Sequence, residues 1–552
     1  MPNPFQCLYY CPFRDNNKAD ILLAASGPQI FSFNVSEGSL LSTWPATTGL
    51  EATERFLQSD SKISCKSVDS VVGEVSASRD EDAERPGKRR KLSRRGSGPE
   101  SASTEILVQG HSKSSANSAS TPAVIKLTGS SNGQYLVAVT GEDKCIRVFE
   151  LHQNGTLVEN SKRYMPKRPC AVVLTTDDST ILCADKFGDV YSMPLLGSSS
   201  EKDPQTPSTN GTAINGEAET SHKPFVPAAS TLTVHTRRNQ QALKNQQKIT
   251  NQAKTKRPLE FEHQLLLGHV SLLTDLAYVT LSASESALGK KRSYILTSDR
   301  DEHIRVSRGL PQAHVIENYC LGHTEFVSKL CVPPWQPQLL VSGGGDDYLL
   351  VWEWLSGTVR LRVNLREQLD GLWNSYTTSI PEGQKPVLDS VIEEIAVSGI
   401  WSMRHLETPD TNIQGEIIVA CEGIPALLFF SLDSQGDLTF RQCVSVAGNV
   451  LDIAVLESRT TILYSTDNIH EMWSTKVVDK GHLRTSLGAV GFSGYTQSWS
   501  KEANIEGNIT IMNQKALARD QISQDGGDKD TTLRELLYGI ENLRKRGEGQ
   551  DD

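Results

Sequence analysis

Two stretches of the chain repeat one set of polar side chains that could take part in chemistry. Each stretch has a Gly-His pair, then a Ser or Thr within an apolar segment, then an Asp in the turn that follows. The two sets are His269, Thr297 and Asp301, and His323, Ser342, Asp346 and Trp352. Within apolar strands such groups can satisfy one another's hydrogen bonds. We therefore interpret both histidines as members of a structural relay rather than as catalytic or metal-binding residues.

The spacing between the turn aspartate and the next strand's aromatic residue points to the elements that position this relay. Trp352 follows Asp346 by six residues, Phe149 follows Asp143 by the same interval, and Ser307 holds the corresponding place after Asp301. A Gly-His pair, an apolar strand, a turn aspartate and a second strand are typical of one blade of a WD-repeat propeller. The sequence thus favours repeated four-stranded blades.

Apolar hairpins recur along the chain and give the number of blades. They lie near residues 21, 134, 179, 293, 338, 416 and 461. We therefore predict an all-β fold, a seven-bladed WD-repeat β-propeller with disordered insertions and a C-terminal helix. An open ring would leave unpaired strand edges, so Phe5 to Tyr10 is expected to supply the strand that closes the ring with the last blade.

Changes in composition divide the chain. Segments rich in Ser, Lys, Arg, Asp and Glu cannot bury enough apolar surface to offset the entropy of ordering, and are predicted to be disordered. The predicted ranges are 1–44 for the first strands and blade, 45–120 for an insertion, 121–196 for blades, 197–259 for a second insertion, 260–513 for the remaining blades and 514–552 for a polar tail.

Both predicted insertions carry basic runs. The first holds a cluster that suits a nuclear-import receptor, with a merely solvated charge run as the alternative. Its residues are Lys88, Arg89, Arg90, Lys91, Arg94 and Arg95. The second, Arg237 to Arg257, could follow a phosphate backbone or be a solvated linker. Neither contains aromatic residues for base stacking, so at most weak electrostatic contact with RNA is expected.

The tail contains one amphipathic segment, predicted as a helix over about 531–546. Thr531 or Thr532 can cap its start, and apolar residues recur at helical spacing. These are Leu533, Leu536, Leu537, Ile540 and Leu543. So short a helix is marginal alone in water, so it is expected to dock on its own propeller or on a partner.

Several function classes find no support in the sequence. The net charge is −10, and the ten cysteines form no CxxC pair, which indicates reduced, buried thiols of an intracellular protein. Gly343-Gly344-Gly345 leads into a strand rather than into the helix that a cofactor loop requires. No P-loop, HExxH or GxSxG motif is present. We predict no catalytic, cofactor-binding or metal-binding residue, no enzyme activity and no contact with membranes.

Four segments are more specific than a generic blade. They are Tyr294 to Arg308, which contains Asp-Arg-Asp-Glu-His-Ile-Arg, with the following Cys320 to Ser328; Ala184-Asp-Lys-Phe-Gly-Asp-Val-Tyr-Ser192; Ser342-Gly-Gly-Gly-Asp-Asp347; and Leu536-Leu-Tyr-Gly-Ile-Glu-Asn-Leu-Arg-Lys-Arg546. With them the chain resembles the WD-repeat, non-catalytic subunit of eukaryotic tRNA (guanine-N7)-methyltransferases, the fungal form in particular.

The resemblance implies a heterodimer. Its other member would be a Rossmann-like catalytic subunit that uses S-adenosylmethionine to methylate guanosine 46 of tRNA, and this chain would bind and stabilise that subunit. From the basic run between Lys88 and Arg95 we expect the chain in the nucleus. The resemblance suggests Arg305 as the first contact residue, then Arg300, His303 and Lys186, with Arg305→Glu expected to abolish partner capture while the fold survives. The alternative is a generic nuclear WD-repeat scaffold for chromatin or ubiquitin-ligase complexes.

Overall fold

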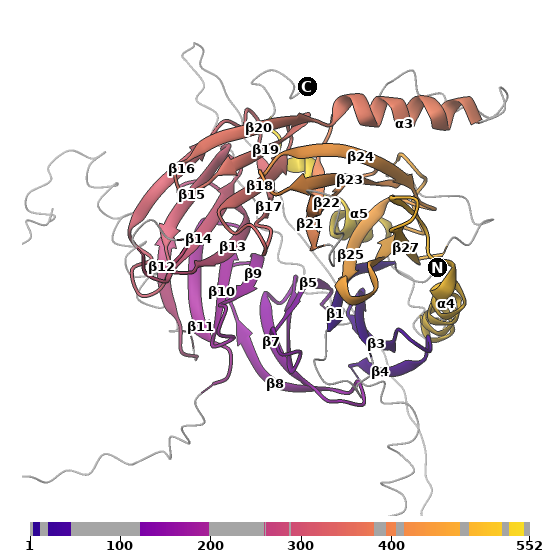
Figure 1. Ribbon diagram of the computed structural model, residues 1–552. Helices are drawn as coiled ribbons and strands as arrows, with labels where there is room; N and C mark the ends of the chain where they lie inside the picture. The colour runs from indigo at the N-terminus through magenta and orange to yellow at the C-terminus, as the bar shows by residue number, and fades with distance from the viewer. Residues whose placement is uncertain are drawn as a thin grey trace, which may run out of the picture. The chain divides into compact units, whose positions relative to one another are not determined.

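The computed structural model shows the chain as a ring of β-sheets (Figure 1). It describes residues 4–11, 20–45, 122–197, 259, 261–285, 289–379, 394–404, 413–474, 485–520 and 529–545. The predicted insertions at 45–120 and 197–259 therefore lie almost entirely outside the described residues, as do the six basic residues from Lys88 to Arg95.

Seven four-stranded antiparallel sheets follow one another around the ring, which confirms the predicted seven-bladed propeller. Each blade takes four consecutive strands. Blade 1 has β1 (Phe5–Cys11), β2 (Ile21–Ser26), β3 (Gln29–Asn34) and β4 (Leu40–Trp44); blade 2 has β5 (Val124–Gly129), β6 (Tyr135–Thr140), β7 (Cys145–Leu151) and β8 (Leu157–Tyr164); blade 3 has β9 (Pro169–Leu174), β10 (Thr180–Asp185), β11 (Asp189–Pro194) and β12 (Gln264–Gly268).

The other four blades continue this order. Blade 4 has β13 (Leu273–Leu281), β14 (Arg292–Asp299), β15 (His303–Arg308) and β16 (Ile316–Leu321); blade 5 has β17 (Val327–Cys331), β18 (Leu339–Gly344), β19 (Tyr348–Glu353) and β20 (Thr358–Asn364); blade 6 has β21 (Val397–Arg404), β22 (Ile413–Cys421), β23 (Ala426–Asp433) and β24 (Leu438–Ser445); blade 7 has β25 (Val450–Leu456), β26 (Thr461–Thr466), β27 (Leu487–Ser493) and β28 (Ser498–Lys501).

The core consists of one apolar cluster at each interface between neighbouring blades. The two middle strands of a blade are buried on both faces because a blade packs against another on either side. Between blades 4 and 5, for example, Leu296 and Val306 pack with Leu340 and Trp352. The seven hairpins predicted from the sequence are these middle strands, whose continuous apolar runs carry the strongest signal.

The prediction that Phe5 to Tyr10 closes the ring within the last blade is wrong. This segment is β1, which pairs with β2 as the inner strand of blade 1. Blade 7 is completed by its own β28 instead. The ring closes through packing and side chains: Asp452 Oδ2 on β25 accepts a hydrogen bond of 2.8 Å from the backbone N–H of Leu8, and apolar residues of blades 1 and 7 share one cluster.

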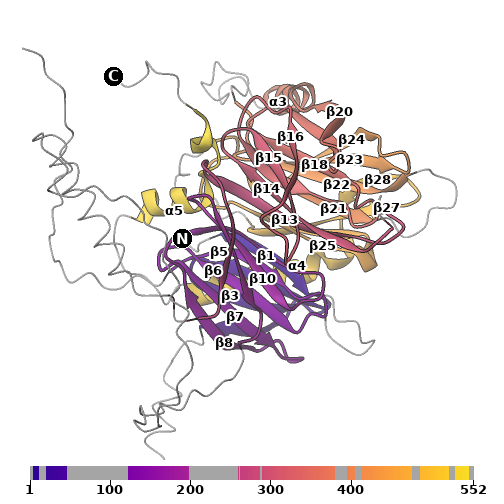
Figure 2. The same ribbon diagram turned by 90° about the vertical axis from the view of Figure 1, so that its left-hand side faces the viewer.

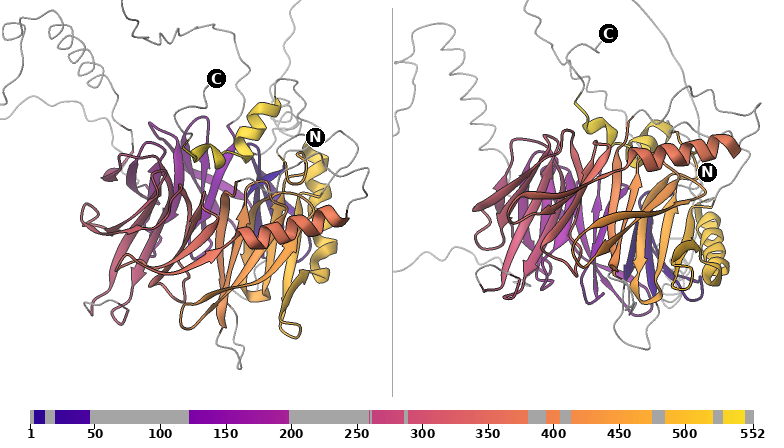
Figure 3. Two further views of the ribbon diagram at one scale, coloured as in Figure 1. Left: turned by 90° about the horizontal axis from the view of Figure 1, so that it is seen from above. Right: turned by 45° about the horizontal axis from the view of Figure 1, so that its top comes forward.

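Helices lie outside the sheets. The helices are α3 (Arg366–Ser379), α4 (Glu506–Asp520) and α5 (Lys529–Leu537), with short 3-10 turns at Glu457–Arg459, Ala503–Ile505 and Glu541–Leu543. From α4, Ile509 and Met512 pack into the cluster shared by blades 1 and 7. Figures 1 and 3 show α4 on the outer wall of the ring, and Figures 2 and 3 show the segment from α5 onward on one face. No helix in the described part of the chain is long and apolar enough to cross a membrane.

The predicted C-terminal helix over 531–546 is too long and starts too late. The helix begins at Lys529, so neither Thr531 nor Thr532 is its cap, and it ends at Leu537, before Tyr538-Gly539. A separate 3-10 turn follows at Glu541–Leu543. Gly539 has the lowest helix propensity of the segment, and Glu422 binds the backbone N–H groups of Gly539, Ile540 and Glu541 from outside the helix.

Candidate interaction face of the propeller

Blade 5 contains a complete version of the polar relay. His323 Nδ1 lies 2.7 Å from Asp346 Oδ2, and His323 Nε2 lies 2.7 Å from Ser342 Oγ. The indole N–H of Trp352 donates to the same Ser342 hydroxyl at 2.8 Å. All four residues are buried, so each polar atom finds its partner inside the blade, where nothing from solution can reach the histidine.

Blade 4 contains only part of this relay. His269 Nε2 lies 3.0 Å from Thr297 Oγ1, while the nearest carboxylate, that of Asp299, is 4.0 Å from Nδ1. Burial, together with the charges of Arg305 and His303, lowers the pKa of His269 to about 4. The prediction that Asp301 belongs to this relay is wrong, because its carboxylate faces outward and pairs with Lys545 at 3.2 Å.

Arg305 binds Ser307, the residue that holds the aromatic position in blade 4. Its Nε donates to Ser307 Oγ at 2.9 Å and its Nη1 to the carbonyl oxygen of Gly268 at 3.1 Å, and the residue is only 8% exposed. This burial argues against the expectation that Arg305→Glu would leave the fold intact. A carboxylate there would be buried beside a carbonyl oxygen, so this substitution cannot separate partner binding from folding.

The C-terminal segment Leu536–Lys545, here called the strap, lies across the blade turns of one face (Figure 3). At its start the Tyr538 hydroxyl donates to the Asp467 carboxylate of blade 7 and accepts from Asn449 Nδ2 at 3.1 Å. Glu422 of blade 6 then accepts from Gly539, Ile540 and Glu541, with distances of 2.6 to 3.1 Å. The strap thus docks on its own propeller, one of the two outcomes predicted.

The end of the strap binds blades 5 and 4. Arg544 donates to the carbonyl oxygens of Gly345 and Ile395, both at 3.1 Å, and Lys545 pairs with Asp301 and Glu302. Arg300, predicted as a partner contact, donates through Nε to the Leu543 carbonyl oxygen at 2.8 Å. Arg300 is thus engaged within the chain, where it holds the strap to the β14–β15 turn.

Blades 3 and 4 keep an uncovered rim on the same face as the strap's last contacts. Its exposed residues are Phe187, Val270, His303 and Leu321. Hydrogen bonds and strand pairing link them: His269 N–H donates to Gly188 O at 2.8 Å, the Arg305 side chain donates to Gly268 O, and His303 pairs with Leu321 across β15 and β16. Phe187 is 61% exposed and Val270 fully so.

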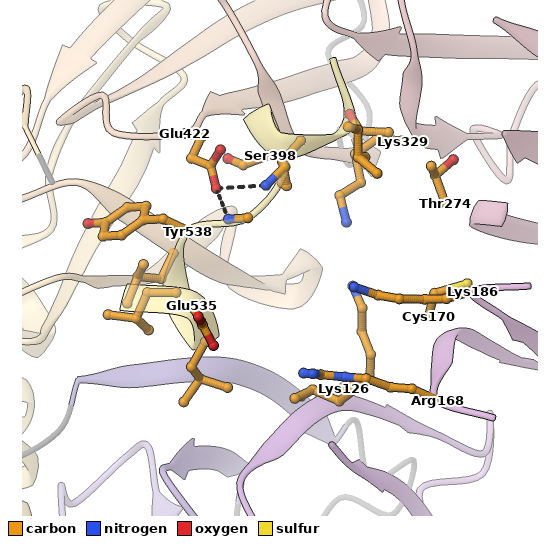
Figure 4. A pocket seen from close by; sticks show the side chains of 18 of the residues that line it. Lys126, Arg168, Cys170, Lys186, Thr274, Lys329, Ser398, Glu422, Glu535 and Tyr538 are labelled. Carbon is orange, nitrogen blue, oxygen red and sulfur yellow. Dashed lines mark hydrogen bonds between the residues drawn. The ribbon is translucent and has the colours of Figure 1, made fainter. Parts of the chain in front are cut away.

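One basic residue, Lys167, lies beside this rim. Lys167 Nζ lies 4.7 Å above the Phe187 ring and 3.5 Å from Asp189. Of the other predicted contact residues, His303 is on the rim, whereas Lys186 extends toward the central channel of the ring (Figure 4). Sequence reasoning missed Phe187 and Val270, because an apolar residue in a turn is typical of a buried blade residue and its exposure is known only from the structure.

Within the described ranges, no group of three or more His, Cys, Asp or Glu side chains could hold a metal ion. The nine cysteines placed by the structure are all free thiols. The arrangement therefore offers contact surfaces: a rigid ring, a strap that fixes its turns and an apolar rim flanked by a lysine and a histidine.

Comparison with known proteins agrees with this architecture. The family model for the tRNA methyltransferase TRM82 WD40 domain matches residues 22–488. The chain is 40% identical over 540 residues to the tRNA (guanine-N(7)-)-methyltransferase non-catalytic subunit TRM82 of Coccidioides immitis, covering 96% of both chains. It is 38% identical to the protein of that name from Aspergillus oryzae, covering 100% of this chain and 99% of the other. The chain belongs to the TRM82 family of WD-repeat, non-catalytic tRNA methyltransferase subunits.

Proposed function

We propose that this chain binds and stabilises the catalytic subunit of a tRNA (guanine(46)-N7)-methyltransferase and is required for N7-methylguanosine at position 46. Support comes from the near-complete coverage of relatives that bear the subunit's name. The structural observation that carries the proposal is the uncovered rim of Phe187, Val270, His303 and Leu321, because exposed apolar side chains grouped on a rigid face are typical of a protein interface.

The chain would act by selecting one conformation of its partner. A surface that binds only the active conformer raises the population of that conformer, and the apparent activity rises with it. The ring suits this role because its turns are fixed by the strap and by buried hydrogen bonds, so little order has to be gained on binding. Any contact with tRNA would be weak and electrostatic.

Methylation of tRNA in vitro tests the proposed function. This chain and its catalytic partner are supplied singly and together, and N7-methylguanosine at position 46 is measured. We expect activity only, or mainly, from the mixture. If the mixture methylates tRNA no faster than the catalytic subunit alone, the chain has no role in this modification and the general scaffold role is favoured.

Substitution of the rim tests the surface itself. Val270→Glu and Phe187→Glu each place a charge where an apolar contact is proposed, and we expect the dissociation constant for the partner to rise about tenfold or more. Tyr495→Glu, at a 98% exposed position in the β27–β28 turn of blade 7, is the matched control. Equal affinity of all three variants would exclude the rim as the interface.

We also propose that the chain works in the nucleus, supported by the basic residues from Lys88 to Arg95. Replacement of all six by Ala should move a fluorescently tagged chain out of the nucleus. If the nuclear fluorescence is unchanged, the six residues are a solvated charge run with no role in nuclear import.

A further inference from the structure

A cavity of about 310 Å³ lies at one end of the central channel, beneath the strap (Figure 4). Blades 2, 3 and 5 line one part of it, and Leu536, Leu537, Ile540 and Leu543 of the strap line another. Four cationic side chains from these blades extend into it in the close-up view. They are Lys126, Arg168, Lys186 and Lys329.

No carboxylate among the described residues lies within ion-pair distance of these four cations. The carboxylates nearby are already bound to backbone N–H groups. Glu422 accepts from three N–H groups of the strap. Deeper in the channel, Asp275 accepts from Leu330 and Asp452 from Leu8, at 2.9 and 2.8 Å. Glu422 and Glu535 are the acidic residues of the lining, while Asp275 and Asp452 act on Lys126 and Lys329 from deeper in the channel and leave Arg168 and Lys186 without such a carboxylate.

Two polar atoms of the lining are buried without a hydrogen-bond partner in the part of the chain that the structure describes. One is Arg168 Nε and the other is Ser398 Oγ. A buried guanidinium N–H without an acceptor costs free energy. An acceptor in the cavity would therefore be favoured.

Burial is the main cause of a lowered pKa at two of the lysines, whereas at Lys126 the charges of Asp275 and Asp452 outweigh burial and raise the pKa. Burial, with a smaller effect from Arg168, lowers the pKa of Lys186. Burial and the charge of Lys126 lower the pKa of Lys329 to about 8, although Asp275 and Asp452 oppose the shift. An anion placed among these groups would relieve their mutual repulsion.

We propose that this cavity binds a small anion that carries more than one phosphate group. Four cations with a hydroxyl and a planar guanidinium present the donors that phosphate oxygens accept. The cavity volume and the strap over it suit a compact free anion, whereas the continuous backbone of an RNA would have to pass the strap. The site is separate from the rim of Phe187 and Val270, and does not depend on the proposed tRNA function.

Calorimetric titration of the full chain with inorganic pyrophosphate, at constant ionic strength, tests the site. We expect saturable binding of one pyrophosphate per chain. The double variant Arg168→Gln, Lys186→Gln should weaken it at least about tenfold, because two charge-assisted contacts are lost. Lys167→Gln is the control, since Lys167 is adjacent to Arg168 but does not line the cavity. Thermal unfolding establishes that both variants fold.

Three outcomes would overturn the proposal. They are no saturable binding by the native chain, unchanged affinity in the folded double variant, and equal affinity for sulfate at matched ionic strength, which would indicate general charge screening. Displacement of pyrophosphate by stoichiometric unmodified tRNA would assign the cations to an RNA backbone and exclude the small-anion site. Persistence of pyrophosphate binding in the presence of tRNA would support it.

Discussion

Blades 4 and 5 carry the same sequence pattern and use it differently. In blade 5 the imidazole, hydroxyl, carboxylate and indole bind one another and are all buried. In blade 4 the aromatic position is Ser307, which binds Arg305, and the aspartate at the pattern position binds the strap. Blade 4, which lacks the aromatic residue, has its pattern aspartate paired with Lys545 of the strap and a buried guanidinium at Arg305.

The difference shows that a blade with an incomplete buried relay can use the same turn to bind other parts of the protein. Blade 4 supplies Arg300, Asp301 and Glu302 to the strap and His303 to the rim. Blade 5 offers the strap a backbone carbonyl at Gly345 and the carboxylate of Glu325. We infer that blade 5 mainly holds the ring together while blade 4 mainly presents contacts.

The largest expected effect is at the aromatic position itself. Trp352→Ala removes a fully buried indole and leaves both a cavity and an unsatisfied Ser342, so we expect a loss of about 3–5 kcal/mol in the free energy of unfolding. Ser307→Ala in blade 4 should cost roughly 1 kcal/mol. Urea unfolding measures both, and equal losses would contradict the contrast between the blades.

The histidines should differ in the same direction but by less. His323→Ala leaves the buried Asp346 carboxylate and Ser342 without their main partner, at a cost of roughly 3 kcal/mol. His269→Ala breaks one bond to Thr297 and should cost roughly 1 kcal/mol. If His269→Ala proved the more damaging, the relay of blade 4 would be more complete than its distances indicate. Thermal unfolding gives the order.

Low pH should reduce the free energy of unfolding through His269 of blade 4. Its pKa falls from about 6.5 when unfolded to about 4 when folded, so the unfolded chain binds the extra proton. The contribution of this group to stability is complete above about pH 6.5 and is lost as the pH falls toward 4. His269→Gln should therefore lose less stability than the native chain between pH 7 and pH 4.5 in urea unfolding. Parallel curves would show that His269 titrates normally.

The smallest effect is expected where blade 4 meets the strap through exposed charges. Lys545 is about half exposed and pairs with Asp301 and Glu302, so Lys545→Ala should change the free energy of unfolding by no more than about 1 kcal/mol. Tyr538→Phe, which removes the buried bond to Asp467, is the comparison and should cost more. A larger loss from Lys545→Ala would locate the strap's main anchor at blade 4.

The sequence predicts the middle strands better than the contacts of the face. The paired strands of each blade are buried on both sides, so their apolar runs identify all seven hairpins. Tertiary packing decides where a strand edge or a tail docks. Sequence reasoning therefore places Phe5–Cys11 in the wrong blade, and it leaves open whether Leu536–Lys545 docks on the propeller or on a partner. Strand alternation correctly put Arg305 and His303 on one face but could not tell that one is buried and the other exposed.

The closure of the ring without a shared strand has a consequence for its motions. Each blade is a complete local meander, so blades can retain their hydrogen bonds while the interface between β1 and β25 separates. Packing, the Asp452–Leu8 bond, the Arg459–Asp20 ion pair and α4 oppose that opening. The amide proton of Leu8 should then exchange with solvent at a rate set by breathing of this seam, faster than the amides of β18 in blade 5, which exchange only when a blade unfolds.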